Sequence, residues 1–182
     1  KKHNYFLISA HREENIDSKE RFEKLIKVMN ELAVQFDLPV IVSTHPRTQK
    51  RIDKSNISFD PKVRLIKPLG FNDYIKLQIN SSSVLSDSGT ITEESSILNF
   101  PALNIRETHE RQEGMEQASV MMVGLDISNI KIGLKILKNQ TKSKDRLLEI
   151  VSDYNINNVS EKVLRIIHSY TDYINRVVWK KY

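Results

Sequence analysis

The stretch SDSGTITEE, residues 86–94, places a turn of small residues directly before two adjacent acids. Ser88, Gly89 and Thr90 would present backbone N–H groups at the start of a helix, where α/β proteins commonly hold phosphate. Gly89 has no Cβ, so a ligand can approach the backbone closely at that position. The stretch therefore predicts a binding site for an anionic ligand.

Two explanations compete for the acids of this stretch. Thr90 followed by Glu93 fits a capping box, and an acid in the first turn suits the helix dipole. Capping does not explain Glu94, which at about 100° per residue lies between Ile91 and Leu98 on the face turned to the sheet. A buried carboxylate needs partners, and it could take two ribose hydroxyls. We favour a site for phosphate and sugar, with helix capping as the alternative.

Polar residues also follow the other predicted strands. His11 and Arg12 follow the first strand, His45 follows the second, and residues 106–113 follow the fifth. A doubly wound parallel sheet binds its ligands at the carboxyl ends of its strands, so these residues are expected to meet. The alternative is that the loops are polar only because they are exposed, and the two histidines directly at strand ends argue against it.

The elements that would position these residues alternate along the chain. Amphipathic helices are expected at about 18–36, from Pro46 onward, and at 71–80, where Asn72 would be the N-cap. Three more are expected from the 86–94 stretch to about 98, at 128–139, and from about 159 towards 179. Apolar strand segments are expected at 4–10, 40–44, 63–67, 83–86, 102–105 and 119–124. This order predicts an α/β fold, a Rossmann-like doubly wound parallel sheet with helices on both faces.

Composition limits the classes of function. The chain has 182 residues and a net charge of +5, which suits an anionic ligand. It has no cysteine, which excludes disulfides and thiolate-metal sites. Lys and Arg form no block of the kind that binds nucleic acid, and no apolar run approaches the roughly 18 residues of a membrane span. His11 and His45 have no third metal ligand at suitable spacing. A strand-like run begins almost at once, so we expect a piece of a longer protein.

Three motifs carry a resemblance to a known family. AHREEN at 10–15, LSDSGTITEES at 85–95 and RETHERQEGM at 106–115 resemble, in order and wording, the carboxyl-terminal domain of the non-hydrolysing UDP-N-acetylglucosamine 2-epimerases. The wording is most similar to the subgroup that acts on UDP-2-acetamido-2,6-dideoxy-L-hexoses for capsule and O-antigen synthesis. The resemblance implies half of a GT-B-type architecture, with two Rossmann-like domains facing across a cleft.

The resemblance also implies roles for individual residues. It assigns the pyrophosphate to His11, which is also a low-ranking candidate for catalysis, and a phosphate to Ser88, Gly89 and Thr90. It implies that Glu94 binds the ribose hydroxyls and that Tyr74 lies beside the uracil, although a position in the core explains Tyr74 equally well. Arg12 and His45 match positions that bind a regulatory UDP-sugar in some members. Arg111 matches a family arginine, although the proline that follows it in the family is Gln112 here; a surface salt bridge is the alternative role for Arg111.

The implied reaction eliminates UDP as the C2 proton leaves and adds UDP back after reprotonation on the other face. The family's acid and base belong to the amino-terminal domain, so residues 1–155 are expected to bind UDP and the helix in 156–182 to pack on that other domain. No cofactor is implied; the whole protein is expected to be a cytoplasmic homodimer. Glu13 and Glu14 are weaker candidates for catalysis. The donor domain of a glycosyltransferase and a non-enzymatic nucleotide-sugar module stay open as alternatives.

Overall fold

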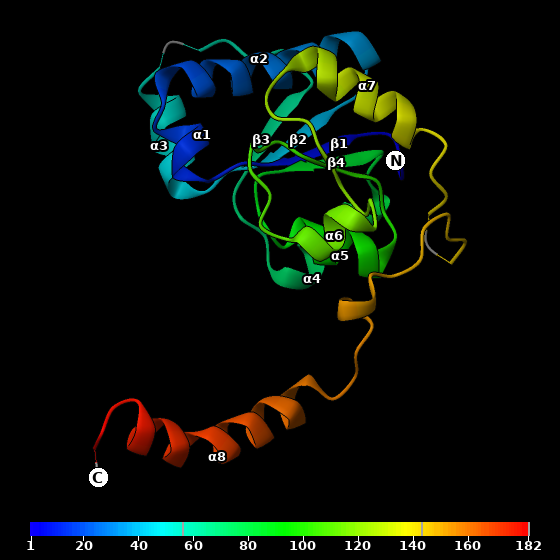
Figure 1. Ribbon diagram of the computed structural model, residues 1–182. Coiled ribbons are helices and arrows are strands. Elements are labelled where there is room, and N and C mark those ends of the chain that lie inside the picture. Colours follow the sequence, from blue (N-terminus) through cyan, green and yellow to red (C-terminus); the bar gives the residue numbers. More distant parts are fainter. Residues whose placement is uncertain (56, 143, 182) are drawn as a thin grey trace. The chain divides into compact units, whose positions relative to one another are not determined.

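A computed structural model describes residues 1–55, 57–142 and 144–181 of the chain. The chain divides into two compact units, Lys1–Val151 and Ser152–Tyr182. The first unit contains the sheet and the helices around it (Figure 1). The second contains a short 3-10 helix and one long α-helix, and each unit is described by itself.

The first unit is built on a six-stranded parallel sheet in the order β3-β2-β1-β4-β5-β6. The strands are β1 Phe6–Ser9, β2 Val40–Ser43, β3 Val63–Ile66, β4 Ser83–Ser86, β5 Ala102–Asn104 and β6 Met121–Met122. Each lies inside a predicted segment, so the predicted doubly wound fold is confirmed. The strand order reverses between β1 and β4, where Phe6 pairs with both Val40 and Ser83, and such a reversal is where open α/β sheets bind ligands.

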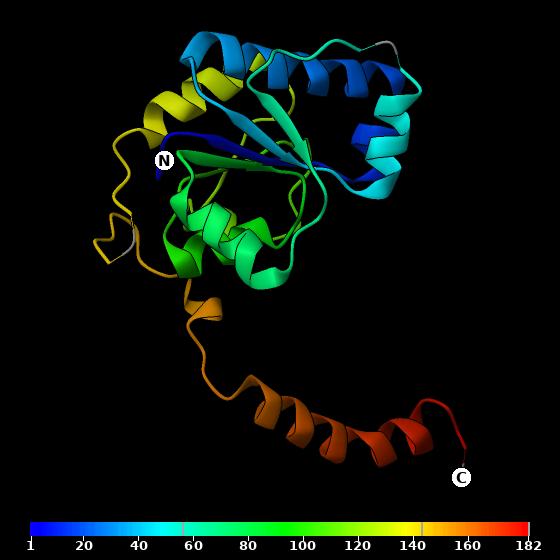
Figure 2. The same cartoon turned by 180° about the vertical axis from the view of Figure 1, so that it is seen from behind.

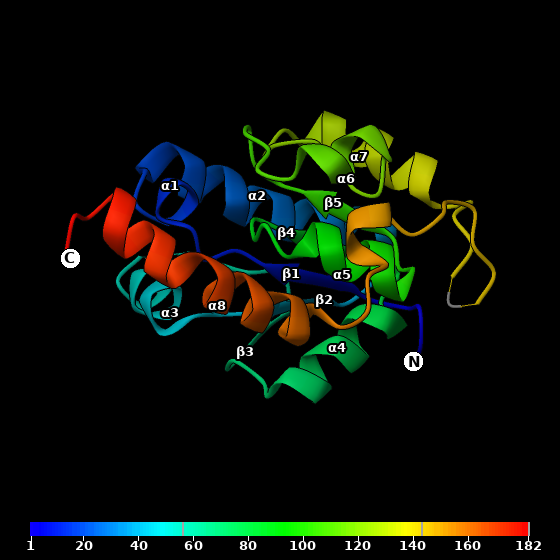
Figure 3. The same ribbon diagram turned by 60° about the horizontal axis from the view of Figure 1, so that its bottom comes forward.

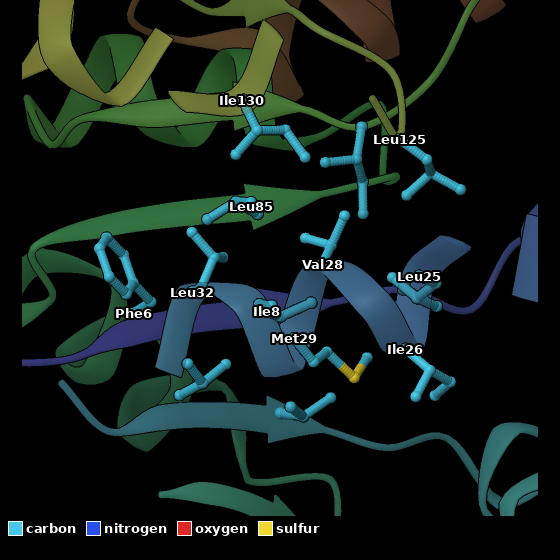
Figure 4. Packing of buried hydrophobic residues seen from close by; sticks show 14 of the residues in the cluster. Phe6, Ile8, Leu25, Ile26, Val28, Met29, Leu32, Leu85, Leu125 and Ile130 are labelled. Carbon is cyan, nitrogen blue, oxygen red and sulfur yellow. The ribbon is translucent and has the colours of Figure 1, made fainter. Parts of the chain in front are cut away.

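Helices cover both faces of the sheet. One face carries α2 (Lys19–Phe36) and α7 (Ile127–Leu137), and the other carries α4 (Phe71–Asn80), α5 (Ile91–Leu98) and α6 (Gln112–Glu116), as Figures 1 and 2 show. The apolar stripe of α2 packs on Phe6, Ile8 and Leu85 (Figure 4). A second cluster beneath the sheet contains Leu7 and Val84. Alternate strand residues thus enter opposite cores, which fixes the register of the sheet.

Several helix starts follow the sequence, and one does not. Ser18 caps α2 by accepting a hydrogen bond from the Arg21 N–H at 3.3 Å, and α3 (Pro46–Asp53) begins at Pro46. The prediction of Asn72 as the N-cap of α4 is wrong. Gly70 takes that position with φ −63° and ψ 157°, so the chain is already helical at Phe71.

The capping box that was the alternative explanation for Thr90 and Glu93 is not formed. Thr90 has helical dihedral angles and makes no side-chain cap; its hydroxyl lies 3.0 Å from that of Ser88. Glu93 instead accepts a 2.7 Å hydrogen bond from Arg111 Nε. The Glu93 carboxylate therefore binds Arg111, from a loop distant in sequence, and not the backbone at the helix start.

The second unit contains the 3-10 helix Ser152–Tyr154 and α8 (Val159–Val177). The large apolar side chains of α8 and the turn after it are exposed: Val159, Val163, Leu164, Ile166, Ile167, Tyr170, Tyr173, Val177, Val178 and Trp179. Tyr182, the last residue of the predicted 156–182 segment, lies outside the described residues. Within the described part of the chain, none of the helices has the length and apolar character needed to cross a membrane.

Candidate functional site

The predicted site residues gather at the carboxyl ends of the strands. The loops after β1, β2, β4 and β5 all open at this end of the sheet, beside α1 (Glu13–Ile16) and α3 (Figures 1 and 3). His11, Arg12 and His45 line one hollow of about 520 Å³ together with Glu13, Glu14 and Arg47. The expectation that the strand-end histidines meet is confirmed.

Asp87 organises the loop after β1. Its side chain is 0% exposed and accepts hydrogen bonds from the N–H groups of His11 (3.1 Å) and Arg12 (3.0 Å) and from Asn15 Nδ2 (3.1 Å). These bonds fix the start of the polar segment after β1, which continues into α1. Sequence reasoning placed Asp87 at a strand end without giving it a role. The signal was available, because an acid that directly follows a buried strand needs partners.

The Ser88-Gly89-Thr90 turn, which is predicted to hold a phosphate and is called the phosphate turn below, lies next to this loop. Ser88 N–H donates to Ser86 Oγ at 3.1 Å, so one of the three amides predicted to be free is used inside the turn. The side chains of Glu110 and Arg111 lie close to Gly89, because a Cβ at this position would be 3.1 Å from Glu110 Oε2 and 3.8 Å from Arg111 Cζ. A carboxylate therefore already lies beside the turn that is expected to hold a phosphate.

Two arginines hold that carboxylate. Arg12 forms a bidentate pair with Glu110, with both N–O distances at 2.9 Å. Arg106, which is 4% exposed, places its Nη1 atom 2.8 Å from Glu110 Oε1 but without the angle of a hydrogen bond, and donates from Nε to Glu14 Oε1 at 3.0 Å. The positive guanidinium groups of Arg106 and Arg12 lower the pKa of Glu110. The four residues Arg12, Glu14, Arg106 and Glu110 are called the arginine cluster below.

Arg111 lies at the start of α6. Its Nε donates to Glu93 Oε1 at 2.7 Å, and its N–H donates to His109 Nδ1 at 3.1 Å. The salt bridge weighed for Arg111 is present, and its partner comes from the helix of the phosphate turn. Gln112 is the first residue of α6, a position where proline is also well tolerated, so the departure from the family pattern keeps the helix start.

The Glu94 side chain contacts α4 and is partly exposed to solvent. Its half-buried carboxylate accepts a 2.6 Å hydrogen bond from Gln78 Nε2, so the expectation that this carboxylate has a partner is met. The Tyr74 side chain packs against the second core cluster. Burial raises the pKa of Tyr74, whose hydroxyl also interacts with Ser9 and Gln78. The core position weighed for Tyr74 is therefore present, and a place beside a uracil stays a prediction.

The remaining charged residues of the hollow are paired. His45 caps α3 by accepting from the Arg47 N–H at 3.3 Å. Arg47 binds Glu13 at 2.6 Å and Asp17 at 2.5 Å. Glu13 and Glu14 thus each neutralise an arginine, which favours a structural role for both. Among the described residues, no three His, Asp or Glu side chains are arranged to hold a metal ion.

Comparisons with known proteins agree on one family. A family model described as UDP-N-acetylglucosamine 2-epimerase matches residues 1–168. Among curated proteins, the UDP-N-acetylglucosamine 2-epimerase of Methanocaldococcus jannaschii is 33% identical over 144 residues, which are 76% of this chain and 39% of that protein. The enzyme of the same name from Campylobacter jejuni is 28% identical over 166 residues, 90% of this chain and 43% of that protein.

Solved structures give the same result. The UDP-N-acetylglucosamine 2-epimerase from Rickettsia bellii is 41% identical with a TM-score of 0.85, covering 98% of this chain and 48% of that one. The Methanocaldococcus jannaschii enzyme in complex with UDP-GlcNAc and UDP is 30% identical with a TM-score of 0.78, covering 92% and 46%. The chain spans less than half the length of each of these relatives.

Proposed function

Because the chain belongs to the UDP-N-acetylglucosamine 2-epimerase family, we propose that it is the nucleotide-binding, carboxyl-terminal domain of a UDP-sugar 2-epimerase. The whole enzyme would invert C2 of a UDP-N-acetylhexosamine in the cytoplasm, as a homodimer. The motif wording supports a role in capsule or O-antigen synthesis on a 2-acetamido-2,6-dideoxy-L-hexose. The family match favours this proposal over a glycosyltransferase donor domain.

One observation carries the proposal. Asp87 ties the His11 loop of β1 to the strand that leads into the Ser88-Gly89-Thr90 turn, and Glu94 follows in the first turn of the same helix, with its N–H bonded to Thr90 O at 2.9 Å. A histidine, a phosphate turn and a carboxylate are thus fixed in the order in which pyrophosphate and ribose occur in UDP. The other possible contacts, from Tyr74, Arg12, His45 and Arg111, border the same end of the sheet.

These groups would act on the leaving UDP. Elimination places negative charge on the β-phosphate as the bond to C1 breaks and the C2 proton leaves. Backbone amides at a helix start, together with nearby cations, favour that charge in the transition state more than in the ground state. The proton at C2 must be removed on one face and returned on the other, so an acid and a base are needed across the sugar. We assign both to the other half of the enzyme, since Glu13 and Glu14 already neutralise Arg47 and Arg106.

A binding measurement tests the nucleotide site. We expect UDP to raise the melting temperature of the 182-residue chain, because a ligand at about 100 times its Kd adds roughly 2.7 kcal/mol of stability. ADP serves as the control for the nucleobase and should shift the temperature less. The absence of any UDP effect in calorimetry and thermal melting would contradict the proposal.

A second measurement tests the assignment of the chemistry. The chain would be incubated with a UDP-N-acetylhexosamine in D2O while C2 is followed by NMR. We expect no deuterium uptake above the buffer rate, since one domain offers one wall of the site and leaves it open to water. Uptake would show that these residues contain the acid or base, and His11, Glu13 and Glu14 would be the first to replace.

The apolar stripe of α8 fits the same proposal. We assign its exposed side chains to contact with the other half of the enzyme, because large apolar patches on a protein surface mark interaction sites. In the isolated chain the far end of α8 should therefore exchange its amide hydrogens quickly. Strong protection through Val177 in a proven monomer would show that the helix is stable without that contact.

A further inference from the structure

We propose that Gln78 is a positioning residue for Glu94 that sets the preference of the site for a ribonucleotide. This inference rests on the proposed function, because it takes the role of Glu94 toward the ribose as given. Gln78 lies in the last turn of α4 and is 0% exposed. Its Nε2 donates to Glu94 Oε2 at 2.6 Å, across the gap between two helices that cover the same face of the sheet (Figure 1).

The orientation of the Gln78 amide is set by Glu94. A carboxylate accepts hydrogen bonds only, so the amide must present its NH2 group to it. This leaves Gln78 Oε1 buried without a hydrogen bond among the described residues, while the amide as a whole also interacts with the Tyr74 hydroxyl. A buried acceptor without a donor lowers the stability of the fold. A methionine of similar volume would avoid that loss, so the glutamine is poorly explained by packing alone.

A neutral donor suits a carboxylate that has to bind hydroxyls. An arginine would neutralise Glu94 and compete with the ligand, as Arg12 and Arg106 do at Glu110. The Gln78 amide instead holds one oxygen of Glu94 and leaves the negative charge in place. The other oxygen then has a fixed direction, which lowers the entropy lost when a ligand hydroxyl binds.

The amide also opposes rotation of the Glu94 side chain. Glu94 is half-buried in the first turn of α5, where a free carboxylate would explore several rotamers and turn towards water. Tyr74, one helical turn before Gln78 on α4, packs on the second core cluster. Gln78 therefore acts through Glu94. Loss of the amide should lower the affinity for ligands that carry both ribose hydroxyls.

The test compares UDP with 2′-deoxy-UDP by titration calorimetry on the 182-residue chain. We expect the unmodified chain to bind UDP roughly tenfold more tightly, the ratio that corresponds to one hydrogen bond to a charged group. Gln78→Met should reduce this ratio to about two- to threefold, mostly by weakening UDP. Its melting temperature should stay the same or rise, because the unsatisfied Oε1 is removed.

Two controls separate positioning from structure. Gln35→Met removes a glutamine that donates to Glu31 at 3.3 Å on α2, and it should leave the UDP to 2′-deoxy-UDP ratio unchanged. In a Glu94→Gln background, Gln78→Met should cause no further loss, because both changes remove one interaction.

Three results would overturn the proposal. The first is a tenfold ratio that Gln78→Met leaves unchanged. The second is an equal weakening of both nucleotides together with a less stable chain, which is the result expected of a structural residue. The third is equal binding of both nucleotides by the unmodified chain, in which case the ribose role of Glu94 fails together with that of Gln78. Tight UDP binding in that last case would still support the proposed function, so the two failures can be told apart.

Discussion

The arginine cluster and the Gln78–Glu94 pair lie at the same end of the sheet, and they hold their carboxylates in different ways. In the arginine cluster, Glu110 is bound by two cations and lies partly in solvent. In the pair, Glu94 is held by one neutral amide whose second polar atom is buried and unsatisfied. A phosphate that reaches Gly89 has to replace ion pairs that already exist. A ribose that reaches Glu94 meets a group that is still charged.

The energies of the two arrangements differ accordingly. The Arg12–Glu110 salt bridge is partly exposed, so water screens it and it contributes little stability. A phosphate that replaced Glu110 would keep the buried Arg106 guanidinium paired with an anion. Buried polar groups are costly when they lack partners. The arginine cluster is therefore suited to release Glu110 in exchange for another anion. The Gln78–Glu94 pair is suited to hold one carboxylate in a constant orientation towards a ligand. Three substitutions test this difference.

The largest effect is expected at Asp87, which anchors the loop that carries Arg12. Asp87→Asn removes the charge that three donors share and replaces one acceptor oxygen by an NH2 donor. With the amide oxygen in the place of Oδ2, that NH2 group would face the His11 N–H, which now donates to both oxygens. We expect a loss of roughly 2–3 kcal/mol in the free energy of unfolding, measured by urea denaturation. UDP binding should weaken as well, because the His11 loop is no longer fixed.

Asp126→Asn is the matched control for this change. Asp126 accepts from the N–H groups of Ser128 and Asn129 at an exposed helix start, where such a cap contributes about 1 kcal/mol. This variant should leave UDP affinity unchanged. Equal stability losses for the two variants would mean that Asp87 is an ordinary cap and not the anchor of the site.

An opposite and smaller effect is expected at Glu110. Glu110→Gln removes the carboxylate beside Gly89 and leaves Arg12 and Arg106 available to a phosphate. UDP should bind about fivefold more tightly, which corresponds to about 1 kcal/mol. Glu107→Gln removes the same charge from a neighbouring residue that pairs with Arg21, and it should change affinity much less. Weaker binding in Glu110→Gln would show that Glu110 orients the arginines for the ligand and does not compete with it.

The smallest effect is expected at His109, next to the cluster. Burial, together with the nearby Arg106 guanidinium, lowers the pKa of His109 below its ordinary value of 6.5. The folded chain therefore holds His109 neutral, and stability that is present above pH 6.5 is lost as the pH falls through the lowered pKa. His109→Gln should lose less stability than the unmodified chain as the pH falls below about 6.5, measured by urea denaturation at a series of pH values. His168→Gln, on α8, is the control, and an equal change there would contradict this origin.

The fold could be predicted because its signals are local. The six strands are short apolar runs, and the stripes of α2 and α7 repeat at helical spacing, so each can be identified without knowledge of its neighbours. The start of α4 was placed wrongly because glycine and asparagine both suit a helix start, and the choice of Gly70 depends on how the chain arrives from β3.

The site was predicted in part, and the missing part depends on contacts between distant residues. His11, Arg12, His45 and the 88–94 stretch were found because they follow strands. The pairing of Glu93 with Arg111 and of Arg12 with Glu110 could not be found from spacing, since it depends on how the β5 loop folds over the phosphate turn. Gln78 left a usable signal, because it lies four residues after Tyr74 and so on the same face of α4.

The separation in sequence between Asp87 and its partners has a consequence for synthesis of the chain. Asp87 bonds to residues 72 to 76 positions earlier, and Glu110 pairs with Arg12 across 98 positions. A ribosome releases its product from the amino terminus at about 5–20 residues per second, so the His11 loop is made well before the strand that anchors it. A chain that stops before β4 lacks both Asp87 and Glu110, so its His11 loop has neither of these partners. The candidate site is therefore complete only after translation has passed the β5 loop.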